Sequence, residues 1–370
     1  MQIGIPLEIR AGEKRVAATP ETVKKLVSAH SVFVQAGAGL GASIPDSEYE
    51  AAGAKILGSA AELYAASQLV LKVRGLEESE FPLVKKDSIL VGLLSPHEKE
   101  KMEAYAKQGL TAFAMESIPR ISRAQSMDVL SSQANIGGYK SVILAANAYG
   151  RFFPMLMTAA GTVKAARVLV LGVGVAGLQA IATAKRLGAV IEAFDVRPAV
   201  KEQVLSLGAK FVEVPLAEGE SAETSGGYAR EMSEEYKQKQ AELIHARAIQ
   251  SDIVITTALI PGRPAPVLLK GETVAAMKHG SVVVDMAVEF GGNCPLSEKD
   301  RVVEKHGVTL IGHTNLPAMM AADASALYAR NMLNFINLLF EPKTGELKID
   351  REDEIIAGTL ISMSGELVKK

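Results

Sequence analysis

Cysteine is almost absent from this chain of 370 residues, in which Cys294 stands alone. A single cysteine excludes an intramolecular disulfide and favours a reducing cytoplasm as the location of the chain. Cys294 lies in GGNCPLSE, a composition typical of a loop, and we interpret it as an incidental thiol, with a nucleophile as the alternative. The six histidines are scattered without the spacing of metal ligands, so the sequence predicts no metal site.

An excess of charge of either sign is also lacking. The chain has 40 basic and 42 acidic residues, a formal net charge of −2, so there is no electrostatic case for binding nucleic acid or an anionic membrane. The N-terminal residues MQIGIPLEIR lack the basic and then apolar pattern of a signal peptide. The uncharged run 168–184 contains three glycines and falls short of the ~20 apolar residues of a spanning helix. Direct membrane insertion is therefore not expected.

Strand-like and helical patterns alternate along the chain. Its length suits two α/β domains, and 48% hydrophobic with 22% charged residues is ordinary for a globular protein. Helices are expected over 20–29, with Thr19 as N-cap, and over 98–108. Strands are expected at 2–5, 31–35, 68–73, 88–94, 111–114, 211–214, 252–257, 281–287 and 309–311. This alternation favours parallel sheets covered on both faces.

Two long helical patterns, 127–152 and 323–340, connect the two halves, with Asp323 or Ser325 as the cap of the second. If the second helix returns the chain, residues 1–130 and 322–370 form one domain and residues 131–321 the other. The sequence thus predicts an α/β fold. It has two Rossmann-like, doubly wound parallel-sheet domains joined by long helices, with a cleft between them as the ligand site.

The most informative stretch is 168–197, VLVLGVGVAGLQAIATAKRLGAVIEAFDVR, which has the pattern strand, glycine turn, helix, strand. Gly172, Gly174 and Gly177 form G-x-G-x-x-G. The first permits a tight turn, the second lets the backbone approach a pyrophosphate, and the third lets the helix pack closely on the strand. The helix start would hold the diphosphate through unpaired N–H groups and its partial positive charge. The stretch predicts dinucleotide binding, with a turn used only for packing as the alternative.

Asp195 ends the second strand of this stretch, where a carboxylate accepts hydrogen bonds from the adenosine ribose hydroxyls. Its charge would repel a 2′-phosphate, so we expect NAD(H) to be preferred over NADP(H). Arg197 weakens this expectation because a nearby arginine can accommodate that phosphate.

A polar segment, 218–240, interrupts the alternation between two strands of the second domain. It is longer than an ordinary connection, and such insertions are often lids or binding loops. Gly226 and Gly227 precede Tyr228, which places an amphipathic ring beside a flexible pivot. We expect a mobile lid over the nucleotide, with a solvated loop and a helical second half as the alternative.

Four stretches together resemble the NAD(H)-binding component of proton-translocating nicotinamide nucleotide transhydrogenase. They are PRISRAQSMDVLSSQ at 119–133, GVGVAG at 172–177, SGGYAREM at 225–232 and VDMAVEFGGNCPLSE at 284–298. The resemblance implies NAD(H) as cofactor and hydride transfer to NADP(H) held on a partner subunit or domain, coupled to proton movement by a membrane-spanning subunit. It also implies a homodimer, active only with its partner, that is cytoplasmic and peripheral to the inner membrane through the partner subunits.

The site residues follow from this resemblance and from the glycine turn. The resemblance assigns the nicotinamide end of the cofactor to Arg120, Gln125, Asp128 and Ser131, and the closing loop to Tyr228. The residues expected to bind the cofactor are Gly172, Gly174, Val175, Ala176, Gly177, Asp195, Val196, Arg197, Gly227, Ala258 and Leu259. Transfer between two nicotinamides moves no proton, so the site needs positioning and exclusion of water rather than an acid or a base. The alternative for 119–133 is a helix start capped by Ser122 or Ser126.

Two other functions stay open. Alanine dehydrogenases share the scaffold, and Arg15 and Lys72 stand at matching positions, but Glu289 replaces the catalytic aspartate. Ser95 stands where the histidine is expected, and His97 comes two residues late. With the proton-handling set incomplete, Arg15 and Lys72 are expected to be structural or to contact the nucleotide. The other alternative is a catalytically silent NAD-binding module that regulates a partner.

Overall fold

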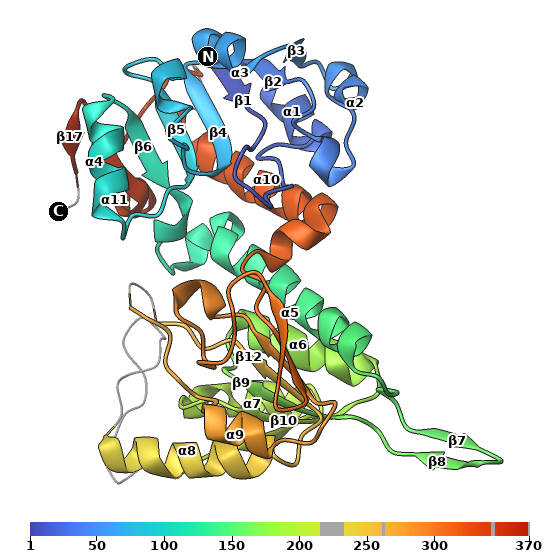
Figure 1. Cartoon of the computed structure of the whole chain (residues 1–370). Coiled ribbons are helices and arrows are strands. Elements are labelled where there is room, and N and C mark those ends of the chain that lie inside the picture. The colour runs from blue at the N-terminus through green and yellow to red at the C-terminus, as the bar shows by residue number, and fades with distance from the viewer. Residues whose placement is uncertain (215–232, 261–262, 342–344, 369–370) are drawn as a thin grey trace. The chain divides into compact units, whose positions relative to one another are not determined.

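The structure, a computed structural model, describes residues 1–214, 233–260, 263–341 and 345–368. The chain divides into two compact units, Met1–Gln133 with Pro317–Lys370, and Ala134–Leu316 (Figure 1). The first unit is discontinuous because the chain returns to it after completing the second. The sequence placed the corresponding boundaries after residue 130 and before residue 322.

The first unit is built on an eight-stranded sheet in the order β17-β16-β6-β5-β4-β1-β2-β3. Strands β1 to β6 pair in parallel, and β16 and β17 extend the sheet in the antiparallel sense. The order 3-2-1-4-5-6 is that of the doubly wound Rossmann sheet. The strands are β1 Gln2–Ile5, β2 Ser31–Gln35, β3 Lys55–Leu57, β4 Leu69–Arg74, β5 Ile89–Leu93, β6 Thr111–Ala114, β16 Leu360–Met363 and β17 Glu366–Leu367.

Helix α10 ties the C-terminal segment to this sheet. Figure 1 shows it in orange among the blue N-terminal elements. The Tyr328 hydroxyl donates to the Lys72 carbonyl at 2.8 Å, and Ser325 Oγ accepts from Val16 N at 3.0 Å. The helix begins at Ala321 after the N-cap Met320, so the predicted cap at Asp323 or Ser325 is wrong. The helices of this unit are α1 Pro20–Leu26, α2 Asp46–Ala51, α3 Ala60–Ala66, α4 Lys99–Lys107, α10 Ala321–Ile336 and α11 Glu354–Thr359.

The second unit contains a seven-stranded sheet in the order β11-β10-β9-β12-β13-β15-β14, parallel except for β14 at one edge. Side chains of β9 alternate between two cores, with Val168 and Val170 in one and Leu169 and Leu171 in the other. Both faces of β9 are therefore covered, which explains its unbroken apolar run. The strands are β9 Arg167–Leu171, β10 Val190–Phe194, β11 Lys210–Val212, β12 Ile253–Thr256, β13 Val282–Asp285, β14 Val302–Lys305 and β15 Val308–Ile311.

The other elements of the second unit are helices and a hairpin. The helices are α6 Val175–Arg186, α7 Lys201–Ser206, α8 Glu234–Ala248 and α9 Gly271–Ala276, and the hairpin strands are β7 Leu156–Thr158 and β8 Gly161–Val163. Helix α5, Val129–Ala148, begins in the first unit and continues into the second. Among the described residues, no helix combines the length and apolarity needed to cross a membrane.

The predicted elements differ from the observed ones mainly at short strands. Strands β3, β14, β16 and β17 and the β7–β8 hairpin were not expected, since runs of two to four residues carry little periodicity. The end of the predicted loop 218–240 is also corrected. Ser233 caps α8 by accepting from Tyr236 N, so residues 234–240 are helical. Residues 215–232 lie outside the described residues.

Candidate functional site

The glycine turn joins β9 to α6 at the carboxyl edge of the second sheet. Gly172 has φ +94°, and Gly177 is buried where an added Cβ would lie 2.0 Å from the Gly172 carbonyl oxygen. These two glycines are required by the turn and by helix packing. Gly174, the N-cap of α6, differs, because an added Cβ there would meet nothing within 4 Å. Its bare backbone borders open space, so packing within the chain does not explain this glycine.

The neighbouring strand supports the turn. Thr257, directly after β12, donates its hydroxyl to the Gly172 carbonyl at 2.8 Å. A Cβ at Gly172 would lie 3.0 Å from the Ala258 amide nitrogen, so the two backbones are in close approach. Ala258 and Leu259, both predicted to bind the cofactor, thus follow a strand that abuts the glycine turn. Leu259 is exposed.

Asp195 lies on the other side of the turn, at the end of β10. Its Oδ2 accepts from Val173 N at 2.7 Å, which fixes the turn to β10. Arg197 donates from its amide and Nε to Oδ1 and from Nη2 to Oδ2, each at 2.9 Å. The guanidinium therefore pairs with the carboxylate that was predicted to accept from a ribose. A 2′-phosphate would have to compete with Asp195 for this arginine.

A hollow of about 220 Å³ opens beside Asp195. Its lining is mostly apolar and includes two aromatic rings, so it suits a flat heteroaromatic ring next to a hydrogen-bonding carboxylate. The lining residues are Asp195, Val196, Pro198, Phe211, Glu213, Val214 and Tyr236. The sequence identified Asp195 and Val196 but not Phe211 or Tyr236, which lie on β11 and α8. Gly227 and Tyr228 of the predicted lid fall outside the described residues.

The predicted nicotinamide residues lie in the first unit, around the start of α5. Asp128 accepts from Ser131 N at 2.9 Å and from Ser131 Oγ at 2.6 Å, the arrangement of a helix N-cap. Asp128, not Ser122 or Ser126, therefore caps this helix start. Arg120 and Gln125 are exposed.

A 3-10 turn, Ser122–Met127, carries Gln125, and Asp128 follows it with extended backbone. The expectation that Gln125 and Asp128 share one face of an α-helix is therefore wrong. The turn is held from α10, where Asn331 Nδ2 and Asn334 Nδ2 donate to the Ser126 carbonyl at 2.8 and 3.1 Å. Sequence reasoning missed both asparagines, because they lie about 200 residues further along the chain.

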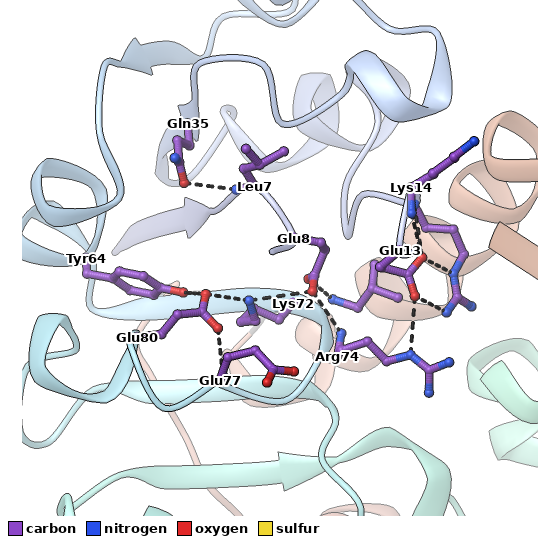
Figure 2. A network of polar contacts seen from close by, with 12 residues as sticks. Leu7, Glu8, Glu13, Lys14, Gln35, Tyr64, Lys72, Arg74, Glu77 and Glu80 are labelled. Carbon is purple, nitrogen blue, oxygen red and sulfur yellow. Dashed lines mark hydrogen bonds and ion pairs between the residues drawn. The ribbon is translucent and has the colours of Figure 1, made fainter. Parts of the chain in front are cut away.

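A buried network of charged side chains surrounds Arg15 and Lys72 in the same unit (Figure 2). Arg15 donates from Nε and Nη2 to the two Glu13 oxygens at 2.8 and 2.6 Å, and from Nη1 to Gln133 Oε1 at 2.8 Å. Arg74 Nε also donates to Glu13, at 3.2 Å. A substrate carboxylate would have to displace Glu13 to bind this arginine.

Lys72 is likewise neutralised by its own chain. Its Nζ lies 2.7 Å from Glu80 Oε1 and 3.5 Å from Glu8 Oε2, and the side chain is 1% exposed. The Tyr64 hydroxyl donates to the same Glu80 oxygen at 2.5 Å. Burial, opposed by the Lys72 charge, raises the pKa of Glu8 to about 7. The contacts of Arg15 and Lys72 therefore support a structural role.

The histidine position of the alanine dehydrogenase pattern has no imidazole near this network. The amides of Leu94 and Ser95 donate to Glu116, and His97 is exposed, with Nε2 3.9 Å from Glu98. Within the described ranges, no group of three His, Cys, Asp or Glu side chains could hold a metal ion. Cys294 is buried, and burial raises the pKa of its thiol, which disfavours the thiolate that a nucleophile needs.

Comparison with known proteins decides the family. Residues 4–137 match the model described as "Alanine dehydrogenase/PNT, N-terminal domain", and residues 141–370 match that of the C-terminal domain. The first portion of the split NAD(P) transhydrogenase alpha subunit of Rhodospirillum rubrum is 54% identical over 377 residues, covering 100% of this chain and 98% of that protein. The chain belongs to the alanine dehydrogenase/PNT family.

Solved structures of the alanine dehydrogenase/PNT family agree. A transhydrogenase from Sinorhizobium meliloti matches with a TM-score of 0.89 and 48% identity over 99% of this chain and 100% of that one. An L-alanine dehydrogenase matches with a TM-score of 0.83 and 27% identity over 100% and 97%. The predicted resemblance and the fold of two Rossmann-like domains are confirmed. Within the family, the chain is more similar to these transhydrogenases than to this alanine dehydrogenase.

Proposed function

We propose that this chain binds NAD(H) at the carboxyl edge of the second sheet and serves as the NAD(H)-binding component of a transhydrogenase. The observation that carries the cofactor site is Gly174, whose missing side chain leaves helix-start backbone facing open space. A diphosphate fits there because the unpaired N–H groups and helix dipole favour an anion. Asp195 and the hollow beside it supply a ribose acceptor and an apolar slot for adenine.

We further propose that hydride passes between NADH on this chain and NADP⁺ on a partner subunit. Bound NADH would supply the hydride, so the chain itself positions the ring and excludes water. Arg120, Gln125, Asp128 and Ser131 are proposed to serve the nicotinamide end, with Tyr228 closing over it. The same proposal includes a homodimer on the cytoplasmic side of the inner membrane, attached through a membrane-spanning subunit that couples transfer to proton movement.

The buried network argues against an amino-acid dehydrogenase. A carboxylate substrate needs available cations, whereas Arg15 and Lys72 are paired with Glu13, Glu80 and Glu8. Displacing these glutamates would leave buried carboxylates without their partners, at a cost of several kcal/mol.

The deciding experiment mixes the purified chain with an NADP(H)-binding transhydrogenase subunit, NADH and thio-NADP⁺, and follows thio-NADP⁺ reduction by absorbance. We expect reduction only when both proteins are present, and no NADH formation from L-alanine and NAD⁺. Reduction by the chain alone would contradict the assignment of the NADP(H) site to the partner. L-alanine oxidation would favour the dehydrogenase, and NADH binding without either reaction would favour a regulatory module.

A further inference from the structure

Asn293 holds both ends of a segment beside the glycine turn. Its side chain is fully buried and bonds only to backbone in the contacts that follow. Ala258 N donates to Oδ1 at 3.1 Å, while Nδ2 donates to the carbonyls of Ala258 at 2.9 Å and Pro266 at 2.8 Å. A carboxamide offers an acceptor and two donors, so this one side chain matches all three backbone groups.

The backbone of Asn293 continues the same attachment. Its carbonyl accepts from Leu268 N at 2.9 Å and from Leu269 N at 3.0 Å. The stretch that begins at Ala258 is thus fastened to Asn293 at its start and again where it rejoins the fold.

Asp285, the last residue of β13, fixes Asn293 in turn. Its Oδ1 accepts from Asn293 N at 3.2 Å and from Thr256 Oγ1 at 3.1 Å, and its Oδ2 accepts from Cys294 N at 3.0 Å. A Cβ at Gly292 would lie 2.7 Å from this Oδ2, and the φ of Gly292 is +80°, so glycine is required there. The GGNC sequence is therefore a built support, not an incidental loop around a cysteine.

Strand order decides which half of a dinucleotide this support faces. Strand β9, which leads into the glycine turn, lies between β10 and β12. Asp195 and the hollow are at the end of β10, so a diphosphate on the turn directs its adenosine toward β10. The other half of the ligand then extends over the end of β12, where Ala258 and Leu259 follow. Asn293 therefore supports the side opposite the adenosine.

We propose that Asn293 is a positioning residue for the nicotinamide half of the cofactor, acting through the backbone of residues 258–266. This inference rests on the proposed function. It assigns the nicotinamide half a support separate from Asp195, so the two halves of the ligand should respond to different substitutions.

The test compares Asn293→Ala with the parent chain by calorimetric titration of NADH and of ADP, which lacks the nicotinamide half. Loss of three hydrogen bonds should weaken NADH binding by roughly tenfold and change ADP binding by less than about twofold. The matched control is Ser251→Ala, a buried serine at the amino edge of the same sheet, whose hydroxyl donates to Arg247 O. It should change neither affinity.

A second variant covers the case in which Asn293→Ala fails to fold. Leu259 is exposed, so Leu259→Ala alters the same segment without touching buried bonds, and it should weaken NADH several-fold with ADP unchanged. Parallel losses of NADH and ADP binding, or unchanged NADH binding in both variants, would overturn the inference. A parent chain that binds neither ligand would instead overturn the proposed NAD(H) site.

Discussion

At the scale of single residues, the pairing of Asp195 with Arg197 bears on cofactor choice. Both carboxylate oxygens accept from the guanidinium, and one also holds Val173 N. The arginine that could bind a 2′-phosphate is therefore committed to the aspartate. A ribose hydroxyl, by contrast, can share a carboxylate oxygen that has lone pairs to spare.

We predict that Asp195→Ala weakens NADH binding by roughly 10- to 100-fold, since a hydrogen bond to a charged group contributes ~1.5–3 kcal/mol. The same substitution releases Arg197, so the preference for NADH over NADPH should narrow. Fluorescence titration of both nucleotides measures this. Equal affinity of the parent for NADH and NADPH would contradict the role given to Asp195.

The buried carboxyl of Glu8 should make stability depend on pH. Its pKa in the folded chain is about 7, against 4.5 for an ordinary glutamate. Between these values the folded chain holds a proton that the unfolded chain has released. Raising the pH through this window therefore favours the unfolded chain, by up to about 3 kcal/mol.

Glu8→Gln removes this titration. The free energy of unfolding of the parent minus that of the variant should therefore fall as pH rises from 4.5 to above 7, as measured by urea unfolding. Glu116, whose pKa burial also raises, is present in both proteins and cancels in the difference. A difference that stays constant or rises with pH would show that the neighbouring Lys72 keeps Glu8 ionised in the folded chain.

At the scale of elements, the glycine turn separates packing from binding. Gly177→Ala would place a Cβ 2.0 Å from the Gly172 carbonyl, and such overpacking typically costs about 1–3 kcal/mol of stability. Gly174→Ala meets no atom within 4 Å and has φ −80°, which alanine adopts without strain.

We therefore predict that Gly174→Ala keeps the parent melting temperature but loses most NADH affinity, whereas Gly177→Ala lowers the melting temperature. Thermal unfolding and NADH titration of both variants check this. Normal NADH binding by a stable Gly174→Ala chain would support the alternative that the turn serves only packing.

The 3-10 turn Ser122–Met127 is the second element with a proposed role. Because α10 holds its Ser126 carbonyl, the turn can present the exposed Gln125 in one place. If Gln125 aligns the two nicotinamides, a displacement near 1 Å can slow transfer by on the order of 100-fold.

Gln125→Asn, which shortens this side chain by one methylene, should therefore lower the single-turnover transfer rate at least roughly tenfold. NADH affinity should change by less than about fivefold, since the adenosine contacts are elsewhere. Rapid-mixing kinetics with the partner subunit measure the rate. Transfer at the parent rate would leave the turn as a folding element only.

At the scale of the whole molecule, the proposed site draws on both units. The glycine turn and Asp195 belong to the second unit, and Gln125 and Asp128 to the first. The predicted cleft between the units stays a prediction. With a net charge of −2, a general electrostatic field does not account for partner recognition, which leaves it to specific surfaces.

The sequence by itself determined what neighbouring residues decide. The strand, glycine turn, helix and Asp195 were predictable because their signals lie within about 30 residues and rest on local sterics and periodicity. The same holds for most strands of both sheets and for the cap at Thr19, where Thr22 Oγ1 accepts from Thr19 N. Short edge strands such as β3 and β14 escaped, because their pairing partners create them.

Tertiary structure decided which polar groups neutralise or support one another. The pairing of Lys72 with Glu8, and the bonds from Asn293 to Ala258 and from Asn331 to Ser126, join residues 35 to 205 positions apart. No local pattern encodes such contacts, since burial at a distant place in the fold forces each group to find a partner. The sequence therefore located the cofactor turn, and the fold selected the side chains that hold it.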